Sequence, residues 1–225
     1  MALQEITPGS EPRWREALAA AGYAHVRTSL ETADPHRAPA GPRRHGVLAA
    51  ARTSARRYEV DWPLPWPEAA LHVEVGGVKV HVAHVPNARN GWIKPQTLAA
   101  LAAGMKAEAG PRLLCGDLNT PRRESPRGEL ITFARDSRGR LRPERGEAWD
   151  YAERALWECG LVDAYRAVHG YGEKDPSWVW SHGGGWRLDH VLVSPDLEPV
   201  AAGYHHGWRD AGLSDHSAIE VELRR

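Results

Sequence analysis

The chain has 225 residues, of which 42% are hydrophobic and 26% are charged, a composition typical of one globular domain of ordinary size. Its 29 basic and 29 acidic side chains cancel, which argues against a protein that coats nucleic acid without specificity but leaves room for a local basic patch. No apolar run approaches the ~20 residues of a membrane span, and no secretory signal follows Met1. The Ala-, Arg- and Gly-rich composition is compatible with a high-G+C bacterial gene, so we expect a single domain over residues 1–225 that is cytoplasmic and makes no membrane contact.

The first half of the chain predicts one helix and several strands. A helix follows the candidate cap Ser10, has Pro12 in its first turn and ends near Gly22. A strand is expected over residues 25–31, a Pro-, Gly- and Arg-rich loop over 33–45, and a buried strand over 46–52. Two alternating runs, 71–75 and 78–85, flank a Gly-Gly pair and predict a β-hairpin.

The second half adds helices over residues 95–110 and 149–160, an apolar strand over 111–117, and alternating runs over 187–194, 199–208 and 217–225. Cys115 and Cys159 lie in apolar or helix-like surroundings, so we expect buried thiols and no disulfide. Residues 121–145 hold eight arginines and four acids, which indicates either a solvated insertion or a basic flap over a phosphate-rich substrate. Many strands with a few helices between them favour a layered α/β or α+β domain.

The run LLCGDLN ends an apolar strand in a carboxylate and a carboxamide. Alternate residues of a strand point to the same face, so Asp117 and Asn119 could project together from the strand end. Gly, Asp, Asn and Pro are also ordinary turn residues, and on this run alone a turn is the simpler interpretation.

Other apolar runs end in the same kind of polar group. The residues are Glu5 in LQE, His84 and Asn87 in HVPN, and Asp215 and His216 in SDH. Asp189 lies inside the apolar run GWRLDHVLVS, where an unpaired carboxylate would cost several kcal/mol. Each residue alone has a structural explanation as a solvated acid, an edge histidine or a cap, so the functional interpretation depends on their occurring together.

In this order and spacing, LQE, HVPN, GDLN, GLVDAYR, GWRLDHVLVS and SDH resemble the endonuclease/exonuclease/phosphatase superfamily, which includes exonuclease III-like and deoxyribonuclease I-like enzymes. The resemblance covers almost the whole chain. It implies a four-layer α-β-β-α sandwich, in which two mixed β-sheets pack together and helices lie outside. It also implies hydrolysis of a phosphodiester by in-line attack of water, with Mg²⁺ or Mn²⁺ as cofactor and nucleic acid, DNA more than RNA, as partner.

The resemblance implies roles for the polar residues. Glu5 is the main metal ligand and Asp215 lies on or beside the metal site. Asp117 orients or deprotonates the attacking water, while Asn119 and Asn87 hydrogen-bond the phosphate or the nucleophile. His216 contacts the scissile phosphate, Asp189 fixes the His216 ring, and His84 lies close to the phosphate. An acid paired with a histidine would also explain the buried Asp189.

Two further side-chain patterns bear on the site. A zinc site at His81 and His84 is disfavoured, because residues three apart on a strand face opposite sides, and a His205–His206 site is the other zinc alternative. Trp186, one of ten tryptophans, occupies the position of an aromatic side chain beside the substrate pocket, although a core tryptophan fits the sequence equally well.

The chain departs from the superfamily pattern in two places. Relatives carry a strand with an Asn before the glutamate, whereas here only four residues precede Glu5, so we expect that strand to be absent, either by truncation or in a genuinely short form. After GDLN, the Arg-rich segment replaces the further acids of nuclease-type relatives, which weakens a claim of abasic-site cleavage. Two alternatives therefore stay open: a phosphatase or phosphodiesterase acting on a small or lipid phosphoester, and a binding module without catalysis.

Overall fold

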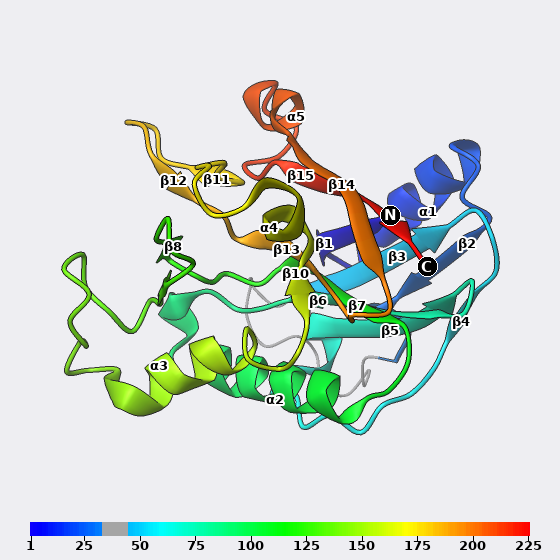
Figure 1. The fold of residues 1–225 in the computed structure, drawn as a ribbon. Helices are drawn as coiled ribbons and strands as arrows, with labels where there is room; N and C mark the ends of the chain where they lie inside the picture. Colours follow the sequence, from blue (N-terminus) through cyan, green and yellow to red (C-terminus); the bar gives the residue numbers. More distant parts are fainter. Residues whose placement is uncertain (33–44) are drawn as a thin grey trace.

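The computed structural model describes residues 1–32 and 45–225, so the loop expected over 33–45 lies outside the described residues except for His45. In the described ranges, no helix is long and apolar enough to cross a membrane. Figure 1 shows two layers of strands with helices on their outer faces.

The first layer is a six-stranded sheet with the order β10-β13-β7-β6-β5-β4. Its strands are β4 (Ala55–Arg57), β5 (Ala70–Val75), β6 (Val78–His84), β7 (Arg112–Asp117), β10 (Val162–Asp163) and β13 (Asp189–Val193). The sheet is mixed, because β6 and β7 are parallel while the other neighbours are antiparallel. All five residues of β13 are buried, as expected for a strand covered on both faces.

The predicted hairpin of β5 and β6 is confirmed. Gly76 and Gly77 join the two strands with φ angles of 58° and 75°. Positive φ at both central residues is the requirement of a type I′ turn, whose twist matches that of the flanking strands. The turn fixes the register of β5 against β6, and the parallel pairing of β6 with β7 places His84 beside Asp117 at the strand ends.

The second layer consists of two antiparallel pieces. One has the order β1-β3-β2, with β1 (Ala2–Ile6), β3 (Gly46–Ala51) and β2 (His25–Thr28), and the other pairs β14 (Glu198–His205) with β15 (Ala218–Arg224). Val47 and Ala49 pack on the first layer through Leu71 and its neighbours, and Ile219 packs there as well. Within the described residues this layer is therefore split and antiparallel, where one mixed sheet was expected.

Helices cover both outer faces. Leu18 of α1 (Glu11–Ala20) packs on Leu48 of the second layer. Leu98 and Leu101 of α2 (Ile93–Ala107) pack on Leu114 of β7, and α3 (Gly146–Ala155) lies against α2. The helices and strands form the expected α/β arrangement of four layers (Figure 1).

Short elements complete the chain. They are η1 (Ser29–Thr32), η2 (Pro67–Ala69), η3 (Ala88–Asn90), β8 (Arg123–Glu124), β9 (Leu130–Ile131), α4 (Ala164–His169), β11 (Trp178–Val179), β12 (Gly185–Trp186) and α5 (His206–Asp210). The run expected over 199–208 therefore ends in a helix, because α5 follows β14 directly. Ser10 stands at the expected cap of α1, but its hydroxyl accepts from the Thr7 backbone N–H and makes no capping bond. Cys115 and Cys159 are free thiols, as predicted, and Cys159 is buried, whereas Cys115 is only partly buried.

Candidate active site

Three strand ends meet at one edge of the six-stranded sheet. In the antiparallel pair of β7 and β13, Asp117 lies directly opposite Asp189. In the parallel pair of β6 and β7, His84 lies beside Asp117, with 3.7 Å between Nε2 of His84 and Oδ2 of Asp117. Sheet register alone thus gathers three of the predicted residues.

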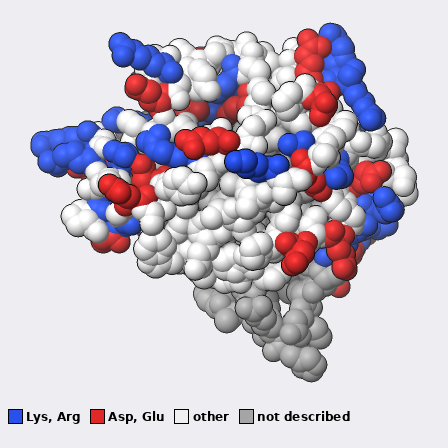
Figure 2. Space-filling model, turned by 60° about the horizontal axis from the view of Figure 1, so that its bottom comes forward, with Lys and Arg blue, Asp and Glu red and all other residues white. Residues whose placement is uncertain are grey.

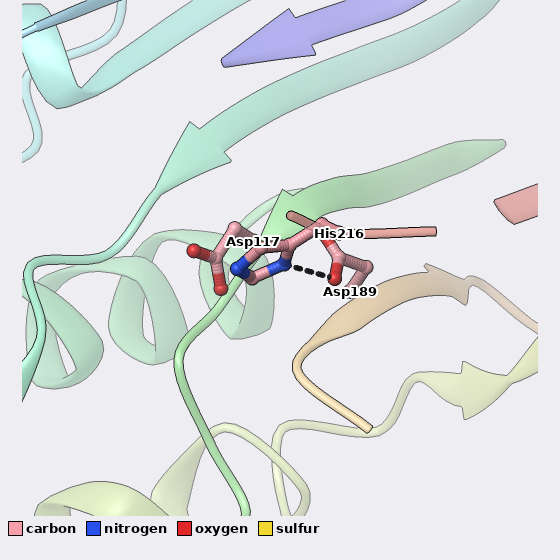
Figure 3. A group of neighbouring side chains, drawn as sticks. All are labelled: Asp117, Asp189 and His216. Atoms are coloured by element: carbon pink, nitrogen blue, oxygen red, sulfur yellow. Dashed lines mark hydrogen bonds and ion pairs between the residues drawn. The ribbon is translucent and has the colours of Figure 1, made fainter. Parts of the chain in front are cut away.

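His216 completes the group from the loop before β15. Its Nδ1 lies 2.7 Å from Oδ2 of Asp189, and its ring stands between Asp189 and Asp117 in Figure 3. A backbone bridge to Trp178 holds His216 in place. The Ser177 hydroxyl accepts from the Asp189 backbone N–H, and the Ser177 carbonyl accepts from the Ser217 N–H, so one residue ties both members of the pair together. The sequence expectation of an Asp189–His216 pair therefore agrees with this geometry.

Burial and neighbouring charges shift the pKa values of two groups in this site, His216 and Asp117. Burial lowers the pKa of His216, but the hydrogen bond and charge of Asp189, with the charges of Asp117 and Asp215, outweigh it and raise that pKa to about 9. Burial and the charge of Asp189 raise the pKa of Asp117 to about 8, against the opposing influence of His216 and the Asn119 N–H. These shifts favour an imidazolium at His216 and a protonated carboxyl group at Asp117 near neutral pH.

Asn119 orients Asp117. Its backbone N–H donates to Oδ1 of Asp117 at 2.8 Å, and its Nδ2 donates to Oδ2 of Asp117 and to the Val85 carbonyl, both at 2.9 Å. The turn that brings the Asn119 N–H groups to the Asp117 carboxylate requires a φ of 49° at Asn119, and Asn is among the few residues that adopt a positive φ readily. The expected turn and the expected functional pair are therefore one structure, in which the Asn119 amide N–H groups already have partners.

His84 connects this group to a second cluster of polar residues. A hollow of about 210 Å³ is lined by His84, Glu5, His45 and Asn87, among others. Glu5 is two-thirds exposed, and its Oε1 lies 3.9 Å from Nδ1 of His45. Burial lowers the pKa of His84, the charges of His45 and His216 lower it further, and those of Glu5 and Asp189 oppose the change. His84 is therefore neutral, between a cationic histidine and an exposed acid.

The remaining predicted residues lie at the rim. Asn87 is exposed and caps η3, with Oδ1 accepting from the Arg89 N–H at 3.0 Å. Asp215 is exposed next to His216 and acts on it through its charge.

One group of side chains in the described residues has the donors and spacing for a metal ion. Single donor atoms of Asp117, Asp189 and His216 all lie within 4.8 Å of one another. The two carboxylates suit Mg²⁺ or Mn²⁺, which prefer oxygen ligands, and a cation would offset the burial and the charge of Asp189 that raise the pKa of Asp117. Glu5 and Asp215, the ligands expected from the resemblance, are outside this group.

The histidines of the zinc alternatives are occupied elsewhere. His81 is fully buried, faces away from His84 and bonds His72 at 2.8 Å and Glu108 at 2.7 Å. His205 pairs with Glu220 and His206 with Asp175.

Sequence reasoning missed Lys94, which supports the site from behind. The Lys94 side chain is fully buried, and its Nζ donates to the Asn119 carbonyl at 2.7 Å and pairs with Oε1 of Glu153 at 2.8 Å. Glu153 also accepts from the Phe133 N–H and the Trp149 indole. A lone lysine beside the apolar run of α2 is a weak signal, because a surface lysine looks the same in the sequence.

A buried ionic network, also missed, anchors the Arg-rich segment near the site. Glu124 of β8 accepts from Arg187 at 2.8 Å and from Arg166 at 2.5 Å, and Arg187 also donates to Asp163 at 2.6 Å. His190 lies beside Arg187 and bonds the Thr120 carbonyl at 2.7 Å. The segment after Asn119 is therefore held against the core.

Aromatic side chains form one wall next to His216. Trp178 stacks on Trp186 with 5.4 Å between centroids, and Trp180 and Phe133 meet the Trp186 ring edge-on at 4.6 and 4.8 Å. All four are only partly buried. Trp186 is thus a member of a half-exposed aromatic wall beside the candidate site and not a buried core residue.

Comparison with known proteins agrees with the resemblance seen in the sequence. No curated protein matches the chain in sequence. Among solved structures, an AP endonuclease from Archaeoglobus fulgidus aligns with a TM-score of 0.73 at 20% identity, and a 3'-5' exonuclease from Neisseria meningitidis with 0.72 at 20%. A 3' phosphatase from Neisseria, solved with a product DNA hairpin, aligns with 0.70 at 21%. Each alignment covers 100% of this chain and 88% of the other, and at these identities it shows the fold alone.

The family model of endonucleases, exonucleases and phosphatases matches residues 1–216, and these enzymes are hydrolases that act on phosphoester bonds. The chain belongs to the Endonuclease/Exonuclease/phosphatase family.

Proposed function

We propose that the protein is a nuclease that uses Mg²⁺ or Mn²⁺ to hydrolyse a phosphodiester of DNA by in-line attack of water. The observation that carries this proposal is the group of Asp117, Asp189 and His216. It combines donors for a hard cation, a cationic imidazole and a carboxyl group of raised pKa within a few ångströms.

His216 is suited to bind the phosphate that is attacked. Because Nδ1 is held by Asp189, the other ring nitrogen is left to donate to a phosphate oxygen. An imidazolium stabilises the negative charge that develops on those oxygens in the transition state. The Asp189 carboxylate keeps the ring both oriented and protonated.

Asp117 is suited to receive the proton of the attacking water. Its orientation is fixed by two hydrogen bonds from Asn119, and with its own proton displaced by a bound cation the carboxylate could accept the proton of the water. Asn119 acts through Asp117, while Asn87 at the rim is free to reach the substrate.

A bound divalent cation would neutralise phosphate oxygens and lower the pKa of a nearby water. Asp117 and Asp189 would supply carboxylate oxygens for it, while the His216 imidazolium, which has no free lone pair, would lie beside it and bind the phosphate. We keep Glu5, which lines the hollow, and Asp215, which is exposed next to His216, as further metal ligands, and neutral His84 as a hydrogen-bonding partner of the phosphate.

The aromatic wall favours a nucleic acid over a compact phosphoester. Rings of Trp178 and Trp186 that are half-exposed beside a phosphate site offer stacking surfaces for bases, and stacking on an aromatic ring contributes ~1–3 kcal/mol per base. An inositol or lipid headgroup presents no comparable flat ring. A DNA strand is therefore the substrate that we favour.

The test measures hydrolysis by metal-free protein to which Mg²⁺ or Mn²⁺ is returned, on labelled DNA, RNA, a 3'-phosphorylated oligonucleotide and bis(p-nitrophenyl) phosphate. Asp117→Asn and His216→Ala are compared with Asp196→Asn and His205→Ala, which change exposed residues of the same types. We expect both site variants to lose at least ~100-fold in kcat while both controls keep it. A folded wild-type protein that cleaves none of these substrates with either metal contradicts the proposal.

A further inference from the structure

The Arg-rich segment contains arginines of two kinds. Some have carboxylate partners, as Arg135 does with Asp150 at 2.7 Å and Arg140 with Asp136 at 2.9 Å. Four others donate to backbone carbonyl oxygens: Arg123, which is exposed, and three that are partly buried. These three, called the arginine cluster below, are Arg122, Arg142 and Arg145.

The guanidinium groups of the arginine cluster lie close together. Nη1 of Arg122 and Nε of Arg142 donate to the same carbonyl, that of Arg135, at 2.8 and 3.3 Å. Arg145 donates to the Phe133 carbonyl, two residues earlier in the same loop. Like charges that share one acceptor repel one another, and nothing in a neutral carbonyl compensates for that repulsion.

Negative charge near the arginine cluster is scarce. In the described residues, one carboxylate pairs with it: Glu144 lies 3.9 Å from Arg142 and is itself 63% exposed. Burial lowers the pKa of Arg122, and the charges of Arg142 and Arg145 lower it further, with Asp136 opposing. Half-buried guanidinium groups without a carboxylate leave donors that an anion would satisfy.

The arginine cluster adjoins the candidate active site. Arg122 follows the turn at Asn119, and the loop that the cluster grips includes Phe133, whose ring packs on Trp186 and lies 4.0 Å from the Lys94 ammonium. Figure 2 shows basic side chains gathering at the left edge of the molecule, the side on which Figure 1 places β8 and the start of α3, with acidic groups between them. With eight arginines and four acids, residues 121–145 carry an excess of positive charge into this side of the molecule.

We propose that the arginine cluster is a second phosphate-binding site, which holds a backbone phosphate of a DNA strand at a nucleotide other than the one being cleaved. Guanidinium groups present paired N–H donors that match phosphate oxygens, which explains why arginine and not lysine fills these positions. The inference rests on the proposed nuclease function and extends it: the substrate is a strand of several nucleotides, with one phosphate at His216 and another at the arginine cluster.

The test uses the full chain with Arg122→Gln and Arg142→Gln combined. The matched control combines Arg127→Gln with Arg138→Gln, which removes the same charge from exposed positions of the same segment. Binding of a fluorescent DNA oligonucleotide is followed by anisotropy in EDTA over a range of salt concentrations, so the result does not depend on cleavage. Cleavage of the oligonucleotide and of bis(p-nitrophenyl) phosphate is measured in parallel, with an RNA oligonucleotide as a further arm.

For the cluster variant we expect about tenfold weaker DNA binding and a salt slope smaller by ~0.7–0.9, the loss of one phosphate contact, while the control stays near wild type. Its activity on the small diester should be unchanged. Equal binding by the cluster variant and its control overturns the inference, as does an equal loss on the small diester, which would indicate a structural role. If the wild type hydrolyses nothing, the nuclease proposal fails while the binding data still decide whether the cluster holds phosphate.

Discussion

Replacing Asp189 by Asn tests the electrostatic basis of the site without relying on activity. The amide has the shape of the carboxylate but no charge. The backbone bonds that place residue 189 stay intact, because the Ser177 hydroxyl accepts from its N–H and its carbonyl accepts from the Tyr204 hydroxyl at 2.6 Å. The variant therefore leaves the backbone in place and removes the charge that raises the pKa of His216 and that of Asp117.

The size of the effect follows from the two opposing influences on His216. Burial alone lowers its pKa, and Asp189 is the main group that raises it to about 9. Without that charge the pKa of His216 should fall to 6.5 or below. A change from about 9 to about 6.5 corresponds to about 3 kcal/mol of interaction between the imidazolium and its surroundings.

The same interaction gives a stability difference whose sign depends on pH. The folded-state pKa of His216 lies above its unfolded value, so the stabilisation is fully present below about pH 6.5 and is lost as the pH rises through about 9. The difference in unfolding free energy between wild type and Asp189→Asn should therefore shrink by about 3 kcal/mol between pH 6 and pH 10.

The assay is an NMR titration of the histidine rings in metal-free protein, with the His216 signal assigned from His216→Gln. His205, which pairs with Glu220 on the far strand, serves as internal control because its titration should be the same in both proteins. If His216 titrates near pH 6.5 in the wild type, or at the same pH in both proteins, the assignment of a charged imidazole to this site is wrong.

Further predictions concern Lys94, Asp117 and the metal. Lys94→Met should lower the unfolding free energy by ~3–5 kcal/mol, because it leaves Glu153 buried without its partner. In urea denaturation the double variant with Glu153→Gln should recover much of this loss, but it should not recover the cleavage rate. Full stability of the single variant would contradict this. Binding of Mg²⁺ at pH 7 should release a proton from Asp117, so the affinity for Mg²⁺ should rise with pH up to about 8. Calorimetry in two buffers of different ionisation enthalpy measures the number of protons released. Binding without proton release would contradict the prediction. Asp117→Asn should stabilise the metal-free protein above about pH 4. The folded-state pKa of Asp117 is raised, so the wild type loses stability as the pH rises from 3.8 to about 8, and the variant does not. A melting temperature of the variant at pH 7.5 equal to or below that of the wild type would contradict this.

The parts of the site that depend on strand ends were predictable from the sequence. Alternation fixes which residues of a strand share a face, and the Gly76-Gly77 turn fixes the register of β5 and β6, so His84 had to arrive at the sheet edge. The pairing of Asp189 with His216 was implied by the family resemblance, and the cost of an unpaired buried carboxylate is consistent with it. These inferences depend on strand alternation, turn geometry or the cost of burying a charge, and each of these can be judged from neighbouring residues in the sequence.

The parts that depend on packing between distant segments were not predictable. Lys94 and Glu153 meet only because α2 and α3 pack together, and neither residue type signals burial in its own helix. Glu5 was expected with Asp215 at the metal, yet it lines a hollow on the far side of His84, a placement set by how β1 crosses β6 and β7. The split second layer likewise follows from pairings between strands that are far apart in the chain.

His84 and His216, which flank Asp117, show why the residue type alone could not tell which histidine is protonated. Both could have been read as cations near a phosphate. In the structure His84 is more deeply buried and lies near the like charges of His45 and His216, so its pKa is lowered, whereas contact with Asp189 raises that of His216. When the surroundings of two neighbouring groups shift their pKa values in opposite directions, one site can hold an acid and a base at the same pH. His216 can therefore donate to a phosphate while His84 can accept from water or substrate, and exchanging the two roles would require moving a single carboxylate, Asp189, from one ring to the other.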